Sequence, residues 1–160
     1  VFSGAKVFYG SAEMSTNQIF NKMAASALSL SSNSIDEDSI LVEQKDSISK
    51  LMAKLMSSSF YVSTETDLDK FIHEIKVYKL QNNLDVVFVD PPRKGCSEEF
   101  LEHLLQASPK EIIYISCDVA TQARDAKYLN EHGYTITNCQ PVDMFPHTFH
   151  IENILRFEKS

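Results

Sequence analysis

Cys117 is the residue whose type and position point most directly to chemistry. It follows an apolar run, Glu111 to Ser116, and it precedes a helical pattern that begins near Asp118. This order predicts a thiol at the carboxyl edge of a sheet, next to a helix N-terminus. The unpaired N–H groups and the dipole of such a terminus favour a thiolate over a thiol. We therefore expect Cys117 to act as a nucleophile.

Two further polar groups are expected at the same edge. Asp90 ends the apolar run Leu84 to Val89, and the segment Asp143 to Glu152 leads into the last predicted strand. Ligands of open α/β sheets bind outside the carboxyl ends of the strands, so one site is predicted. Each residue also has a structural explanation. Asp90 could cap a rigid turn, Cys117 could be a small buried hydrophobic residue, and Glu152 could face solvent.

The spacing of histidines and cysteines does not predict a metal site. His147 and His150 form an HxxH pair, but no third cluster of ligands accompanies them. Cys96, Cys117 and Cys139 are widely spaced and form no CxxC pair. An odd number of separated cysteines is typical of reduced thiols in an intracellular protein. We expect no metal, and an intracellular location whose compartment the sequence leaves open.

The elements that position these residues follow from apolar periodicity. Strands and helices alternate, and no helix separates the last two strands, which predicts an α/β open sheet with an antiparallel final pair. The predicted strands are Lys6–Tyr9, Leu84–Val89, Ile112–Ile115, Tyr134–Cys139 and Ile151–Glu158, and the predicted helices are Thr16–Leu28, Asp67–Tyr78, Glu98–Gln106 and Asp118–His132. Ser97 and Asp118 are expected to cap the last two helices, and Gly133 to end the final one.

Residues 26–66 are predicted to be a serine-rich insertion within a single domain, 1–160. Twelve serines lie between Ser26 and Ser63, with no glycine or proline. A surface helix is expected there because five apolar residues fall on one helical face: Leu41, Ile48, Leu51, Met52 and Leu55. A helix that binds a membrane surface or a partner is the alternative, although this face has few bulky aromatic residues.

The overall charge limits how the chain can bind a polyanion. The formal net charge is −7, and the half from Leu84 onward has seven Lys and Arg against twelve Asp and Glu. This argues against a surface that binds phosphate backbones throughout, so any such contact must come from a local patch. No apolar run approaches the roughly 20 residues that span a bilayer, and we expect no membrane partner.

Three motifs of the C-terminal half resemble those of one enzyme family. Ile112 to Asp125, IIYISCDVATQARD, is similar to the nucleophile motif of the S-adenosylmethionine-dependent RNA uracil-C5 methyltransferases. Asp90 to Gly95, DPPRKG, and Asp143 to Glu152, DMFPHTFHIE, resemble two other motifs of that family. The motifs stand in the family's order and cover residues 84–160 densely, while Phe8 to Glu13 resembles a weaker turn on the cofactor side.

The resemblance implies a reaction and a role for each candidate residue. Cys117 would add to C6 of a uracil, S-adenosylmethionine would supply the methyl group to C5, and Glu152 would remove the C5 proton. Asp90 would lie beside the methyl donor. The substrate would be a transfer or ribosomal RNA with its target base out of the stack. Local contacts to RNA would come from Arg93, Lys94, His147 and Phe149.

The chain also departs from the family pattern. Asp118 and Val119 stand where the family usually has Asn-Pro, and the Asp118 charge would oppose thiolate formation. The family's glycine-rich loop, its acidic strand end and its RNA-binding barrel do not occur in this sequence. We therefore expect the C-terminal portion of a truncated Rossmann-like methyltransferase fold that binds S-adenosylmethionine weakly or not at all. In the family's sheet order, two strands absent here would separate the strand at Lys6–Tyr9 from Val86–Val89.

Two other functions remain open. The chain could be a non-catalytic remnant or interaction module that keeps the fold, although packing alone requires neither Cys117 nor Glu152. A cysteine hydrolase would need His147 or His150 within hydrogen-bond reach of the Cys117 sulfur. The methyltransferase instead needs an open slot for a base between Cys117 and Glu152.

Overall fold

A six-stranded sheet organises the chain, which a computed structural model describes over residues 5–11, 14–30, 41–56, 60–65, 68–82, 84–143, 147 and 151–160. The strand order is β2-β1-β3-β4-β6-β5. Neighbours from β2 to β4 are parallel, whereas β6 is antiparallel to both β4 and β5, as predicted for the last pair. The strands are β1 (Val7–Ser11), β2 (Phe60–Ser63), β3 (Val86–Asp90), β4 (Glu111–Ser116), β5 (Tyr134–Val142) and β6 (Glu152–Lys159).

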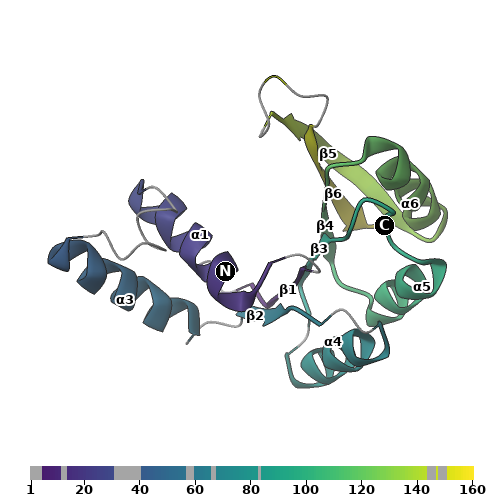
Figure 1. The fold of residues 1–160 in the computed structure, drawn as a ribbon. Coiled ribbons are helices and arrows are strands. Elements are labelled where there is room, and N and C mark those ends of the chain that lie inside the picture. Colours follow the sequence, from purple (N-terminus) through teal and green to yellow (C-terminus); the bar gives the residue numbers. More distant parts are fainter. Residues whose placement is uncertain are drawn as a thin grey trace.

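The helices fall into two groups on opposite sides of the sheet (Figure 1). Three of them, α4, α5 and α6, follow one face of the sheet, while α1 and α3 pack against each other beyond β1 and β2. The helices are α1 (Thr16–Leu28), α3 (Val42–Met56), α4 (Leu68–Asn82), α5 (Glu98–Ala107) and α6 (Val119–Glu131). Every helix predicted from periodicity is present, and α3 is the helix expected within the serine-rich segment. No helix of the described segments combines the length and apolarity needed to cross a membrane.

The core lies between the sheet and α4, α5 and α6. One row of side chains crosses four neighbouring strands in register, and each member of the row is fully buried: Phe8, Val87, Ile112 and Phe157. Phe71 of α4 packs edge-on against Phe8, with ring centroids 5.5 Å apart. Alternate residues of β3 and β4 are only half-buried on the other face, as the twofold period of a strand requires.

The predicted caps fix where the last two helices begin and end. The Ser97 side chain accepts a hydrogen bond from the Phe100 N–H at 3.2 Å, and Asp118 accepts one from the Thr121 N–H at 2.9 Å. Gly133, with φ of 92°, follows α6 in the left-handed conformation that suits glycine. Because Asp118 is the N-cap of α6, this helix begins directly after Cys117.

Two features of the sheet differ from the sequence analysis. The strand β2 was not predicted, because its four residues follow serine-rich sequence; it joins β1 through Tyr61, whose ring stacks on Phe8 at 5.1 Å. The two strands that separate the first strand from β3 in the family's sheet order are not among the described strands, and β1 pairs directly with β3 from Val7–Val86 onward. That pairing satisfies the edge hydrogen-bonding groups that β3 would otherwise expose.

Asp85, the residue that precedes β3, provides a test of stability against pH. Asp85 accepts a hydrogen bond from the Lys6 N–H at 2.9 Å, and its other oxygen lies 2.6 Å from Lys110 Nζ. The Lys110 hydrogen bond, followed by that from Lys6, lowers the pKa of Asp85. Asp85→Asn should therefore reduce the free energy of unfolding by about 1 kcal/mol at neutral pH.

The sign of the pH dependence follows from the lowered pKa. The stabilisation is present above the unfolded-state pKa of about 3.9 and is lost as pH falls through the lower folded-state value. Urea unfolding of wild type and Asp85→Asn at neutral pH and near pH 2 checks this. Asp46→Asn is the control, because Asp46 forms an exposed ion pair with Lys50 on α3. An equal difference at both pH values would contradict the assignment.

Candidate functional site

Cys117 and Glu152 lie at the same end of the neighbouring strands β4 and β6. The last residue pair of that antiparallel ladder is Ser116 with Asn153. Cys117 directly follows Ser116, and Glu152 directly precedes Asn153 as the first residue of β6. Both residues are half-buried. The structure thus places two residues that are 35 positions apart in the sequence at the same end of one strand pair.

Asp90 reaches the same edge from the neighbouring strand. Val89 pairs with Tyr114, so Asp90 lies level with Ile115, two residues before Cys117. Its carboxylate accepts a hydrogen bond from Ser11 Oγ at 3.4 Å. Burial, with a smaller contribution from Asp90, raises the pKa of Tyr9 to about 12, so Tyr9 is neutral there. All three predicted site residues therefore occupy one edge.

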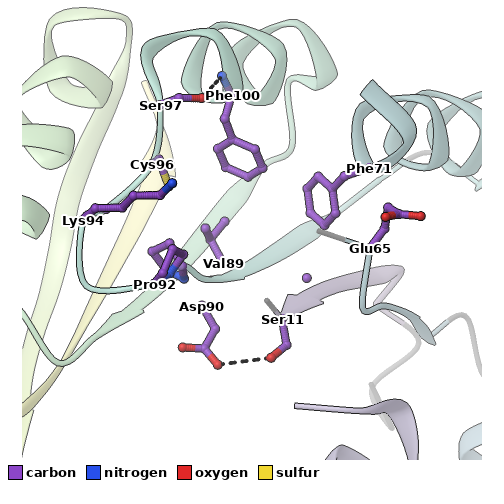
Figure 2. A pocket seen from close by; sticks show the side chains of 13 residues that line it. Ser11, Glu65, Phe71, Val89, Asp90, Pro92, Lys94, Cys96, Ser97 and Phe100 are labelled. Carbon is purple, nitrogen blue, oxygen red and sulfur yellow. Dashed lines mark hydrogen bonds between the residues drawn. The ribbon is translucent and has the colours of Figure 1, made fainter. Parts of the chain in front are cut away.

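A cavity of about 530 Å³ borders Asp90 at the ends of β1 and β3. Figure 2 shows Asp90 and Ser11 on one side of it and the rings of Phe71 and Phe100 on the other, with Glu65 nearby. Its wall is thus apolar toward α4 and α5 and carries two carboxylates. Cys117 and Glu152 do not line this cavity. Asp90 stands between the cavity and the strands that carry them.

The loop after Asp90 is fastened to α6. Thr121 Oγ1 donates to the Arg93 carbonyl at 2.9 Å, and Arg124 Nη2 donates to the carbonyls of Lys94 and Cys96 at 3.1 and 2.9 Å. Gly95 has φ of +75°, and a Cβ there would approach Arg124 Nη2 to 2.7 Å. Only glycine fits this turn, which holds the exposed Arg93 and Lys94 at the rim of the site.

A buried carboxylate, which sequence reasoning did not find, completes this attachment. Asp125 is 1 % exposed; Oδ2 accepts from the Cys96 N–H and from Tyr114 Oη, both at 2.7 Å, and Oδ1 accepts from Arg124 Nε at 2.8 Å. The sequence did contain a signal for its burial, because Asp125 lies four residues before the apolar Leu129 and therefore on the same face of the helix. Asp125 links the loop, the strand β4 and the helix α6.

The three cysteines occupy different environments. Burial raises the pKa of Cys96 to about 12, so this residue is a protonated thiol at neutral pH. Cys139 is exposed on β5, where its Sγ lies 3.5 Å from Asn153 Oδ1. Cys117 is half-buried beside the start of α6. The Thr121 N–H lowers the pKa of Asp118, which therefore carries a negative charge next to Cys117.

The remaining predicted residues give less information. His147 is exposed, with φ of 69°. Phe149, His150 and Glu13 lie outside the described residues. Where side chains are described, no group of three His, Cys, Asp or Glu residues is arranged to hold a metal ion.

Comparison with known proteins identifies the fold. A proposed tRNA (m1A22) methyltransferase from Streptococcus pneumoniae, solved with S-adenosyl-L-methionine, covers 98% of this chain with a TM-score of 0.53 and 12% sequence identity. The chain covers 67% of that protein. This likeness shows a Rossmann-like methyltransferase fold. The Pyrococcus abyssi tRNA (uracil-54, C5)-methyltransferase, solved with S-adenosyl-L-homocysteine, is 32% identical over 63% of this chain and 22% of its own, with a TM-score of 0.45.

Sequence comparison identifies the family. An uncharacterized RNA methyltransferase of Caldanaerobacter subterraneus is 45% identical over 84 residues, which are 52% of this chain and 19% of the relative. One from Listeria innocua is 56% identical over 70 residues, 44% of this chain and 16% of the relative. The chain thus spans less than a fifth of the length of these relatives. A family profile described as tRNA (Uracil-5-)-methyltransferase matches residues 7–160. The chain belongs to the tRNA (uracil-5-)-methyltransferase family.

Proposed function

We propose that the complete protein methylates C5 of a uridine in transfer or ribosomal RNA, with Cys117 as nucleophile and Glu152 as base. The observation that supports this proposal is the β4–β6 register, whose last pair, Ser116 with Asn153, directly adjoins Cys117 and Glu152 in the sequence. The reaction needs a nucleophile at C6 and a base at C5, which are adjacent atoms of one ring. Family membership supports the same reaction.

The first half of the reaction depends on Cys117. C5 of uracil is a poor nucleophile, and addition of a thiolate to C6 moves the π electrons of the C5–C6 bond toward C5 and the neighbouring carbonyl. The helix α6 starts just beyond Cys117, so its free N–H groups and dipole favour the charged sulfur, while the charge of Asp118 opposes it. When bound, S-adenosylmethionine would supply the methyl group to C5 as its bond from sulfur to that methyl breaks, and it would leave as S-adenosylhomocysteine.

The second half depends on Glu152. Its carboxylate accepts the C5 proton, the electron pair restores the C5–C6 double bond, and the bond between C6 and Cys117 Sγ breaks to release the thiolate. Glu152 is the first residue of β6, at the end of the strand nearest Cys117, so it can face a uracil bound to Cys117. The proton then passes from Glu152 to water.

The residues beside Asp90 suit part of a methyl donor. The carboxylates of Asp90 and Glu65 can accept hydrogen bonds from hydroxyl or ammonium groups, and the rings of Phe71 and Phe100 offer an apolar wall. Asp90 would hold the donor. The glycine-rich loop that cradles such ligands is not in this sequence, so these 160 residues supply only part of a cradle.

Calorimetry of the 160-residue chain with S-adenosylmethionine should therefore detect weak binding or none. One side of the ligand would have no protein contact, and that loss removes most of the binding free energy. Micromolar affinity for the isolated chain would contradict this expectation. The complete protein is the matched control, and it should bind.

RNA contacts would be local. Arg93 and Lys94 are exposed on the loop fastened to α6, at the rim of the proposed site, where they can meet phosphates next to the target base. A nucleobase stacked inside an RNA duplex cannot reach Cys117, so the target uridine must be unpaired or flipped out of the stack. This agrees with a net charge of −7, which disfavours binding over a wide surface.

Nucleoside analysis by mass spectrometry tests the proposal. Transfer RNA and ribosomal RNA lacking modifications are incubated separately with the complete protein and S-adenosylmethionine, then digested and searched for 5-methyluridine. Methylation at C5 in either RNA supports the proposal and identifies the substrate class. RNA binding without product would indicate a non-catalytic module, and release of acyl products from ester substrates would indicate a hydrolase.

A further inference from the structure

A pair of buried amides joins the two strands that carry Cys117 and Glu152. Gln122 of α6 is 1 % exposed and Asn153 of β6 is 7 % exposed. Asn153 Nδ2 donates to Gln122 Oε1 at 2.6 Å. Gln122 Nε2 donates to the carbonyls of Tyr114 and Asn153, both at 3.0 Å. One side chain of α6 is thereby bonded to both β4 and β6.

The amide pair sits at the end of the β4–β6 ladder. Asn153 pairs with Ser116, the last pair of that ladder, and Glu152 and Cys117 follow immediately. Side chains alternate along a strand, so Asn153 points toward α6 while Glu152 points to the opposite face. Beyond this pair the ladder places no further constraint on how far Cys117 lies from Glu152.

Directional bonds explain why polar groups occupy this buried position. Two apolar side chains would fill the same volume without a desolvation cost, but they would not fix the spacing of two backbones. A satisfied buried polar network specifies one arrangement of the elements it connects. Here the elements connected are β4, β6 and α6, which carry the proposed nucleophile, the proposed base and the helix terminus beside them.

We propose that Gln122 and Asn153 are positioning residues that set the spacing between Cys117 and Glu152, and so control release of the methylated RNA. This inference rests on the proposed function. Addition of Cys117 to C6 needs the thiolate and the RNA, whereas release needs Glu152 at C5 while Cys117 is still bonded to C6. A change in spacing between the two strands therefore slows release more than addition.

The test compares three variants of the complete protein with unmodified uridine RNA and S-adenosylmethionine. Asn153→Leu leaves Gln122 Oε1 without its donor, and Gln122→Leu leaves Asn153 Nδ2 without its acceptor and the carbonyls of Tyr114 and Asn153 without the Gln122 donor, so both should lower stability. The double variant removes both amides and leaves only the two carbonyls without that donor, so it should be more stable than Gln122→Leu. In all three, turnover should fall about 10- to 100-fold, as expected for a small displacement of a catalytic group. The fraction of protein held as a covalent RNA adduct should rise.

A purely structural role predicts a different result. The double variant would then recover turnover together with stability, and no adduct would accumulate in any variant. Leu129→Ala is the matched control, because Leu129 is buried on the same helix seven residues beyond Gln122 and should lower stability without accumulation of adduct. Urea unfolding of each variant measures the stability term separately.

The test separates the two proposals from each other. Wild-type protein that forms no adduct with 5-fluorouridine RNA would overturn the proposed function, and the inference with it. Wild-type protein that forms the adduct, together with a double variant that turns over at the wild-type rate, would overturn the inference alone. A stable double variant with slow turnover and accumulated adduct supports both.

Discussion

Cys117→Ala in the complete protein is expected to lower the rate of 5-methyluridine formation by at least about 10⁴-fold, the scale on which removal of a nucleophile acts. Without the sulfur there is no addition to C6, so C5 does not gain the electron density that takes up the methyl group. RNA affinity should change little, because the substitution removes one small side chain. The measurement is methyl incorporation into RNA, with affinity followed in parallel.

Two matched variants sharpen this prediction. Cys139→Ser replaces an exposed thiol on β5 with a hydroxyl that can still donate to Asn153 Oδ1, and it should leave the rate unchanged. Glu152→Gln should allow addition and methyl transfer but slow release by about 10²- to 10⁴-fold, the usual contribution of a general base. The Cys117 assignment would be contradicted if Cys117→Ala retained turnover, or if Cys139→Ser lost it.

Asp125→Ala is expected to produce the largest loss of stability, about 3 kcal/mol or more. The carboxylate is 1 % exposed and accepts from Tyr114 Oη and the Cys96 N–H, and both donors would be left buried without an acceptor. Arg124, which is 57 % exposed, would keep access to water. For a chain of this size the melting temperature should fall by roughly 6–12 °C.

Thermal and urea unfolding check this value. Lys127→Ala is the control, because its side chain is 76 % exposed on the same helix and should change stability by no more than about 0.5 kcal/mol. A loss below about 1 kcal/mol for Asp125→Ala would show that the loop after Asp90 does not depend on this network for its attachment to α6.

Local signals in the sequence were sufficient to place most of the elements and the site residues. The caps Ser97 and Asp118 each precede a run with clear helical period, and both accept the expected backbone hydrogen bond. The apolar strand ending at Asp90 and the one preceding Cys117 are buried on alternate residues in the sheet. Because the ends of parallel strands share one edge, the prediction that these groups converge needed no knowledge of packing.

The features that sequence reasoning missed depend on contacts between distant residues. The strand β2 has four residues, and its place beside β1 is set by aromatic packing such as that of Tyr61 on Phe8. Gln122 and Asn153 are 31 positions apart, and nothing in the sequence pairs one amide with the other. The direct contact of β1 with β3 follows from edge pairing in this chain, which an analogy to a longer sheet could not supply.

The central claim is that Cys117 forms a covalent bond to C6 of a uridine. The most direct measurement is the intact mass of the complete protein after incubation with 5-fluorouridine RNA and S-adenosylmethionine, followed by peptide mapping. A base cannot remove fluorine from C5 as it removes the C5 proton, so release should stop and the adduct should persist. We predict a protein–RNA adduct in which the uridine carries one added methyl group and is attached to the peptide that contains Cys117. An unmodified protein mass, or an adduct that forms equally in Cys117→Ala, would contradict the claim.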